Sequence, residues 1–173
     1  MPVVGEHSRF AVEYALNENH GGEWMFGRFC YWCGGRRVGD YELGTSLRDV
    51  LFQLEQLARD RGLRASRRFR TMSAIDVFRL LNAALFGAAD LNNARVAEEE
   101  QWTRHAIFPP VDVFDSWKGF LAEDEEAARL IFAHDPYLDV TELPLKSGEV
   151  DAVLDLARNA LSEIHERVTR IGL

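Results

Sequence analysis

Two cysteines three residues apart are the first feature of this sequence that could carry chemistry. Cys30 and Cys33 have the CxxC spacing of redox-active thiols and of many zinc ligands. In a thioredoxin-like site the motif opens a helix, but here two glycines follow it directly. If both cysteines lie in one strand, their spacing sends the two side chains to opposite faces. We interpret them as ordinary strand or turn cysteines; a small redox or metal-dependent enzyme using Cys30 and Cys33 is the alternative.

Other candidates for catalysis or metal binding are sparse. The five histidines are scattered, and none pairs with another at the i, i+4 spacing of a helical metal site. The sequence contains no P-loop, no G-x-G-x-x-G and no G-x-S-x-G motif. We therefore expect no catalytic residues, no metal, no cofactor and no enzymatic activity.

Charge is more informative about partners. The formal net charge is −8, and its distribution is uneven. Residues 1–86 carry 12 basic and 10 acidic side chains, whereas residues 87–173 carry 8 basic and 18 acidic ones. A negative field of this kind disfavours nucleic acid and favours a basic protein partner. The sequence thus predicts a protein partner and no nucleic acid.

Two acidic clusters could form the binding surface for such a partner. Their exposed carboxylates would steer a basic protein toward the surface, or they could serve only to keep the protein soluble. The candidate partner-binding residues are Glu98, Glu99, Glu100, Glu123, Asp124, Glu125 and Glu126.

One segment, Arg59–Arg70, is basic although the chain as a whole is acidic. It contains six arginines with Phe69 among them. We interpret it as a solvated loop between helices that neutralises nearby carboxylates, or as one edge of a protein interface. A nucleic-acid-binding module using Arg59–Arg70 is the remaining alternative.

Aromatic residues are dense between Gly22 and Trp32. Because alternate residues of a strand point to opposite faces, some of these rings could be exposed and available to a partner. Packing in the core and between strands is the commoner explanation.

The elements that must position these groups begin with a β-meander. Residues 9–16 alternate apolar and polar side chains, as expected of a strand, and residues 17–22 form a turn. Residues 23–32 predict a second strand, with Gly27 at a bulge, and a tight reversal at 33–35 leads to a short strand at 36–41.

Three main helices follow from helical periodicity and capping signals. Ser46 with Asp49 begins a helix that ends before Gly62, and Ser73 with Asp76 begins another that ends before Gly87. A long helix is predicted over 149–171.

The region between these helices is less regular. Residues 88–102 predict a loop or a frayed helix, and 106–108 a short strand. Strands at 117–122 and 127–133 form a hairpin with an acidic tip, or a single helix covers 122–132. Residues 140–145 predict a strand that Pro144 interrupts or confines to a sheet edge.

These elements predict an α+β fold in a single domain over residues 1–173. One mixed, mostly antiparallel sheet of meander strands would carry the three main helices packed mainly on one face. No signal peptide and no apolar run long enough for a bilayer is present, so we expect a cytoplasmic protein that does not contact a membrane.

Several segments are similar to one known family. Residues 10–14, 22–24, 29–32 and 38–41, followed by 43–52, resemble the Immunity protein 42 family, although Gly5-Glu6-His7 stands where that family is expected to have Gly-Asp-Pro. The family accompanies toxins of bacterial polymorphic-toxin and contact-dependent inhibition systems. The resemblance implies an antidote that binds a cognate toxin domain, often a nuclease, and carries no catalytic residues.

Overall fold

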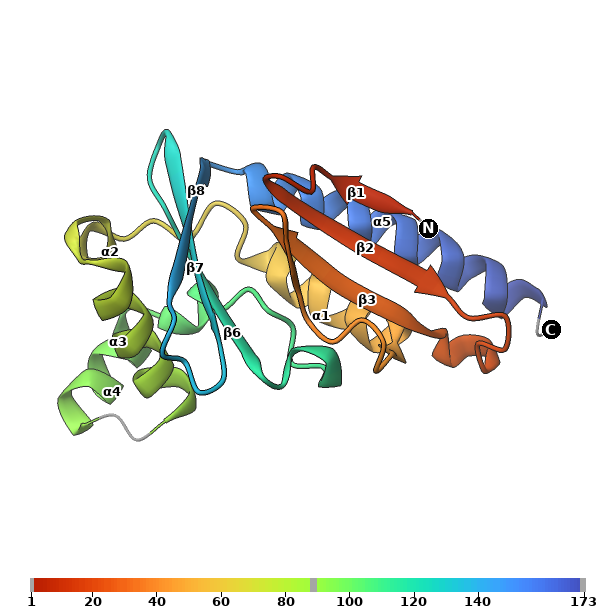
Figure 1. The fold of residues 1–173 in the computed structure, drawn as a ribbon, viewed down its shortest axis with the longest axis horizontal. Helices are drawn as coiled ribbons and strands as arrows, with labels where there is room; N and C mark the ends of the chain where they lie inside the picture. The colour runs from red at the N-terminus through yellow and green to blue at the C-terminus, as the bar shows by residue number, and fades with distance from the viewer. Residues whose placement is uncertain (1, 88–89, 172–173) are drawn as a thin grey trace. The chain divides into compact units, whose positions relative to one another are not determined.

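The computed structural model describes residues 2–87 and 90–171. Within them the chain forms five α-helices and two antiparallel sheets, so the predicted α+β class is confirmed (Figure 1). The chain contacts divide into two compact units. One unit comprises Met1–Arg59, Pro109–Ser116 and Glu149–Leu173, and the other comprises Asp60–Phe108 and Trp117–Gly148. This division does not test the single-domain assignment, which stays a prediction.

The first unit is built on a sheet of five strands. In chain order the strands are β1 (Val3–Gly5), β2 (Phe10–Leu16), β3 (Phe26–Cys33), β4 (Arg36–Val38) and β5 (Thr45–Ser46). The order across the sheet is β1-β2-β3-β4, and β5 also pairs with β3. Gly34 and Gly35 form the turn between β3 and β4 with φ angles of 60° and 81°. Two successive positive φ angles suit the twist of a two-residue hairpin, which explains the paired glycines.

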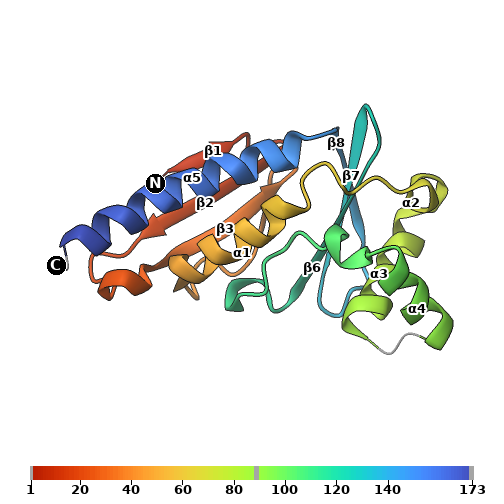
Figure 2. The same ribbon diagram turned by 180° about the vertical axis from the view of Figure 1, so that it is seen from behind.

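One face of this sheet is packed against two helices, α1 (Leu47–Arg59) and α5 (Glu149–Ile171). Phe10, Val12 and Tyr14 alternate along β2 and are buried. Figure 2 shows α1 and α5 side by side along the sheet. The helices bury apolar stripes at helical spacing, which are Leu47, Val50, Leu51 and Leu54 of α1 and Val150, Val153, Leu154, Ala157 and Leu161 of α5. Burial of such side chains stabilises a fold by about 1.5–3 kcal/mol each.

The second unit contains a three-stranded sheet and three helices. Its strands are β6 (Trp117–Glu123), β7 (Ala127–His134) and β8 (Thr141–Lys146), in the order β6-β7-β8. Its helices are α2 (Arg67–Thr71), α3 (Ala74–Phe86) and α4 (Leu91–Glu99). Their apolar side chains form one core with the sheet, which includes Phe69, Val77, Phe78, Leu81, Trp102, Phe120 and Ile131.

Most of the predicted elements are confirmed. The Ser46 hydroxyl accepts a hydrogen bond from the Asp49 backbone N–H at 3.2 Å, and Ser73 caps α3 in the same way at 3.1 Å. The long helix has the predicted bounds, and the acidic hairpin is formed by β6 and β7 in preference to a helix over 122–132. Pro144 lies in the edge strand β8, and residues 91–99 are helical, while residues 88–89 lie outside the described part.

Four predictions about the fold were wrong in detail. The strands form two sheets instead of one mixed sheet, and every strand pair within them is antiparallel. Residues 106–108 contribute only an isolated bridge between Ala106 and Phe120. Residues 23–24 belong to a 3₁₀ turn (Gly22–Trp24), so β3 starts at Phe26, and β2 and β3 pair continuously through Gly27 without a bulge. The expected loop over the basic segment contains α2.

Gly27 has a steric role at the crossing of β2, β3 and α1. A Cβ at this position would lie 2.3 Å from the Ala15 carbonyl oxygen and 2.8 Å from Leu47 Cδ1. The first of these atoms belongs to the backbone and has no rotamer that relieves the clash. Glycine is therefore required here by space, with no positive φ angle involved.

Replacing Gly27 with alanine should consequently lower the free energy of unfolding by about 3 kcal/mol, the upper range for overpacking. Gly35→Ala is the control, because its φ is +81° but no atom lies within 4 Å of an added Cβ. The control should lose about 1–2 kcal/mol from the left-handed backbone alone. Urea unfolding followed by circular dichroism measures both, and an equal loss in the two variants would contradict the steric explanation.

Candidate functional site

The first acidic cluster lies where α4 ends. Glu98 and Glu99 occupy its last turn, and Glu100 is the residue that follows. Carboxylates at this end of a helix face the negative pole of its dipole, which costs about 0.3–1 kcal/mol for each charge. Glu99 lies 3.5 Å from Arg95, one turn earlier, and this exposed pair offsets little of that cost.

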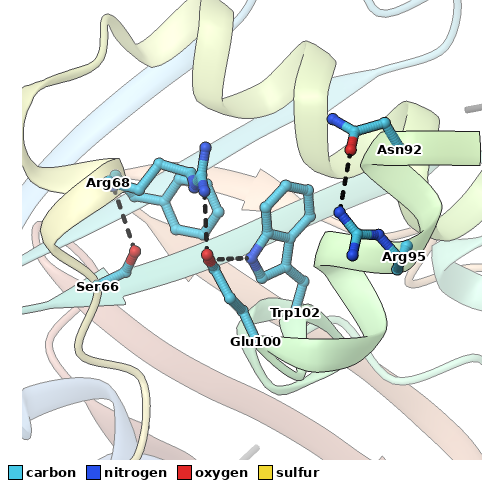
Figure 3. Close-up of polar contacts among 7 residues, drawn as sticks. Ser66, Arg68, Asn92, Arg95, Glu100 and Trp102 are labelled. Carbon is cyan, nitrogen blue, oxygen red and sulfur yellow. Dashed lines mark hydrogen bonds and ion pairs between the residues drawn. The ribbon is translucent and has the colours of Figure 1, made fainter. Parts of the chain in front are cut away.

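Glu100 is held more firmly than its neighbours. Its carboxylate accepts hydrogen bonds from Arg68 Nη2 at 3.0 Å and from Trp102 Nε1 at 2.8 Å (Figure 3). Trp102 itself is buried, and the Arg68 guanidinium lies 5.6 Å from the centroid of its ring. The hydrogen bonds from Arg68 and then Trp102 lower the pKa of Glu100 below its ordinary value of 4.5. Glu100 thus joins α2 to the segment after α4.

The second acidic cluster forms the hairpin between β6 and β7, and its first two residues are structural. Glu123 is buried, and its Oε1 accepts a hydrogen bond from the Gly148 N–H at 2.9 Å. Asp124 Oδ1 accepts from the N–H groups of Glu126 and Ala127 at 2.9 and 2.8 Å, which fixes the turn and lowers the pKa of Asp124. Aspartate at this position closes the turn much as a backbone carbonyl would.

Three of the seven predicted acidic residues point into solvent without a partner in the described part of the chain. They are Glu98, Glu125 and Glu126, all of them exposed. The structure therefore divides the predicted set into residues that hold the fold together and residues that remain available for interaction.

The basic segment Arg59–Arg70 does not form one continuous cationic surface. Arg64 is fully buried, and its Nε donates a hydrogen bond to the Arg104 carbonyl at 2.7 Å. Arg68 binds Glu100, and Arg70 Nε lies 3.6 Å from Asp124 Oδ2. At least three of the six arginines thus serve internal contacts. The prediction that this segment neutralises nearby carboxylates is confirmed, and the structure gives no support to a nucleic-acid-binding module.

Helix α2 positions these arginines although it has only five residues. Ser66 caps it by accepting a hydrogen bond from the Phe69 N–H at 3.3 Å, and the Phe69 ring is fully buried. Arg129 of β7 contacts the C-terminal end of α2, where its Nη1 donates to the carbonyls of Phe69 and Met72 at 2.5 and 2.9 Å. These carbonyls would otherwise lack helical partners.

The two cysteines lie on opposite faces of β3. Cys30 pairs across the strands with Glu13, whereas Cys33 pairs with Phe10. Both thiols are buried and unoxidised. Burial, with the nearby Glu13 carboxylate, raises the pKa of Cys30 to about 12, and burial also raises the pKa of Cys33. A reactive thiol needs a lowered pKa, so these two positions do not support the redox alternative.

A groove beside α1 in the first unit was not predicted from the sequence. It has a volume of about 680 Å³ and is lined by residues of β3, the 43–46 segment, α1 and residues 110–112. Trp24 and Phe26 on its wall are each 46% exposed. The aromatic density of residues 22–32 was the available signal, and both explanations considered for it hold in part, because Trp24 and Phe26 are exposed while others pack in the core. Phe29 and Tyr31 are buried.

Other kinds of site have little support in the part of the chain that the structure describes. No group of three or more His, Cys, Asp or Glu side chains is arranged to hold a metal ion there. Among the same residues, no helix is both long enough and apolar enough to cross a bilayer.

A small α+β protein with paired charges, exposed acids and an aromatic groove is thus defined. The chain belongs to the Immunity protein 42 family, whose sequence model matches residues 1–160. Its fold is similar to that in the crystal structure of CdiI from Burkholderia dolosa AUO158, with a TM-score of 0.72 and 22% sequence identity. The match covers 94% of this chain and 99% of that one. No curated protein sequence matches the chain.

Family membership confirms the resemblance found in the sequence. The matched region extends well beyond residues 10–52, on which that resemblance mainly rested. The alternatives of a redox or metal-dependent enzyme and of a nucleic-acid-binding module receive no support from the comparisons.

The Glu100 contact yields a pH prediction. Because the folded-state pKa of Glu100 is lowered, the stabilisation it provides is present above the ordinary value of 4.5 and is lost as the pH falls through the folded-state value. Glu100→Gln should therefore destabilise the protein at pH 7 by about 1 kcal/mol or less, since the pair is partly exposed. The difference from the unmodified protein should shrink as the pH falls below 4.5.

Urea unfolding of both proteins from pH 7 down to acid pH measures this difference. Glu99→Gln serves as the matched control, because the same charge is removed from an exposed pair. It should change the free energy of unfolding by no more than about 0.5 kcal/mol, since the lost pair with Arg95 is offset by removal of a charge that the helix dipole disfavours. A difference for Glu100→Gln that stays constant across this pH range would contradict the assigned ionic contact.

Proposed function

We propose that this protein is an immunity protein that binds a cognate bacterial toxin domain and neutralises it stoichiometrically. Membership of the Immunity protein 42 family is the observation that carries the proposal. Inhibition by binding needs a surface that remains occupied and no group that turns over a substrate. The raised pKa values of the two thiols and the paired charges of the basic segment are consistent with a protein that acts without catalysis.

The toxin domain that fits this protein is basic. Residues 87–173 have ten more acidic than basic side chains, and Glu98, Glu125 and Glu126 are exposed. Toxins that act on nucleic acid need cationic surfaces, so a nuclease is a natural partner of such a field. The proposed place of action is the cytoplasm, where a nuclease would meet its substrate.

The exposed acids are proposed to speed the encounter with the toxin. Charges at the rim of an interface mainly raise the association rate, whereas buried contacts decide how long a complex persists. Glu99, Glu100, Glu123 and Asp124 already make contacts within the protein. Of the seven predicted residues, we therefore assign the steering role to Glu98, Glu125 and Glu126.

Neutralisation can be tested in living cells. Inducing the toxin domain encoded by the adjacent upstream gene should stop growth of a host bacterium, and co-expression of this protein should restore it. A co-expressed Gly27→Ala variant, expected to be poorly folded, should protect less. Growth arrest that persists despite expression of the folded protein would refute the proposal for that pair.

The steering role has its own kinetic test. The variant Glu125→Lys/Glu126→Lys should associate with the purified toxin domain at least about threefold more slowly at low salt, with a flatter salt dependence. The control, Glu163→Lys/Glu166→Lys on α5, changes the net charge by the same amount at exposed positions. Stopped-flow fluorescence measures both, and equal rates for the two variants would remove the hairpin tip from the interface.

A further inference from the structure

The groove beside α1 has the features of an anchoring site. We propose that it binds an apolar side chain of the toxin domain that is flanked in the toxin by a lysine or arginine. This inference rests on the proposed function, because it specifies which part of the toxin is gripped and where.

An apolar occupant follows from the walls of the groove. Trp24 and Phe26 are each 46% exposed, and Leu43 is 60% exposed. The two rings are stacked with an angle of 7° between their planes and 6.4 Å between their centroids. Large apolar side chains gathered at one concave place on a surface mark binding sites, because covering them releases water and lowers the free energy.

Trp24 and Phe26 form an aromatic wall of the groove, and Trp24 is held in place by contacts within the protein. The Arg48 guanidinium lies 3.7 Å from the Trp24 ring centroid and covers one face of that ring. Arg48 Nε is also 3.5 Å from Asp49 Oδ1. A wall whose rotamers are already set loses little side-chain entropy on binding, which favours tight association.

The size of the groove limits what can enter. Its volume of about 680 Å³ lies within the range of about 300–1,000 Å³ found for pockets that enclose a small ligand. It therefore has room for one or two side chains of a loop. The rest of the toxin would have to contact other surfaces.

The charges at the rim of the groove determine which toxin residue can lie beside the inserted apolar side chain. The charged residues that line the groove are Asp49 and Asp112. The Asp49 side chain is 49% exposed, and Asp112 is exposed without a side-chain partner in the described part of the chain. Because Asp49 already pairs with Arg48, Asp112 is the carboxylate with which a lysine or arginine next to the inserted side chain would pair, whereas an acidic neighbour would be repelled.

Two glycines lie among the residues that line the groove, Gly27 and Gly44. An added Cβ on Gly44 would lie 3.1 Å from the Gly27 carbonyl oxygen, and Gly44 has a φ of +76°, which L-residues rarely adopt. A side chain at Gly44 is therefore disfavoured, and one at Gly27 is excluded by the Ala15 carbonyl oxygen.

Binding measurements with the purified cognate toxin domain test the proposal. Phe26→Ala should raise the Kd at least tenfold, as truncation of a hot-spot aromatic does, mainly through faster dissociation. Leu43→Lys should weaken binding further, because it places a cation against the basic residue of the toxin. Asp112→Asn should raise the Kd less, and its effect should vanish at high salt.

Matched controls separate the groove from general surface changes. Phe86→Ala and Leu138→Lys alter side chains that are 54% and 80% exposed in the second unit, and both should leave the Kd unchanged. Circular dichroism and urea unfolding show whether each variant is folded. Because Leu43 is 60% exposed, its replacement tests the groove even if Phe26→Ala is destabilised.

The outcomes distinguish this inference from the proposed function. If the unmodified protein neutralises the toxin while Phe26→Ala and Leu43→Lys bind as tightly as the controls, the groove is not the anchor, and the immunity function stands. If the unmodified protein neither binds nor protects, the proposed function fails for that pair and the anchor with it. If light scattering shows a dimer that Leu43→Lys dissociates, a second copy of this chain occupies the groove, and the proposal is overturned.

Discussion

The guanidinium of Arg129 stabilises α2, the short helix whose arginines contact the acidic residues of the second unit. A helix of five residues cannot form by itself, because nucleation costs more than a single turn returns. Arg129 donates to the carbonyls of Phe69 and Met72 and so completes α2, while Phe69 anchors it in the core. With α2 in place, Arg68 reaches Glu100 and Arg70 reaches Asp124. One side chain of β7 thereby supports the helix that contacts one residue of each acidic cluster.

The charge pattern acquires a different meaning once these contacts are known. Counted along the sequence, the acidic runs look uniformly available to a partner. In the structure, Glu100 ties α2 to the segment after α4, Glu123 and Asp124 hold the β6–β7 hairpin, and Glu99 pairs with Arg95. Only Glu98, Glu125 and Glu126 of the seven residues have no side-chain partner in the described part of the chain. The surface field that a partner meets therefore comes from fewer carboxylates, arranged around a framework that the others hold rigid.

Local signals predicted much of the fold, and long-range contacts account for the errors. Serine caps, helical stripes and the glycine pair at 34–35 each act within a few residues, so the helices at 47–59, 74–86 and 149–171 and the two hairpins were predictable. Helix α2 was not, because its stability comes from Phe69 burial and from Arg129, about sixty residues away. The number of sheets was likewise hidden, since strand periodicity shows that a face is buried but not which strands are neighbours.

The candidate site was predictable in composition more than in arrangement. The acidic residues and exposed aromatic rings could be named from the sequence, but the pairing of Glu100 with Arg68 joins positions 32 residues apart. The groove combines residues near 24, 44, 49 and 111, which no local pattern brings together. The steric need for glycine at position 27 comes from the Ala15 carbonyl oxygen, a contact that exists only in the folded backbone.

The lining of the groove separates what must stay constant from what is free to vary. Gly27 and Gly44 are held by close backbone contacts, whereas Trp24, Phe26 and Leu43 are about half exposed. Under the proposed anchoring role, exchanges at these three exposed positions would change which protein fits while leaving the scaffold intact. A family member could therefore acquire affinity for a different toxin through single substitutions that preserve folding. Proteins of the same fold could in this way diverge until each neutralises only its own toxin.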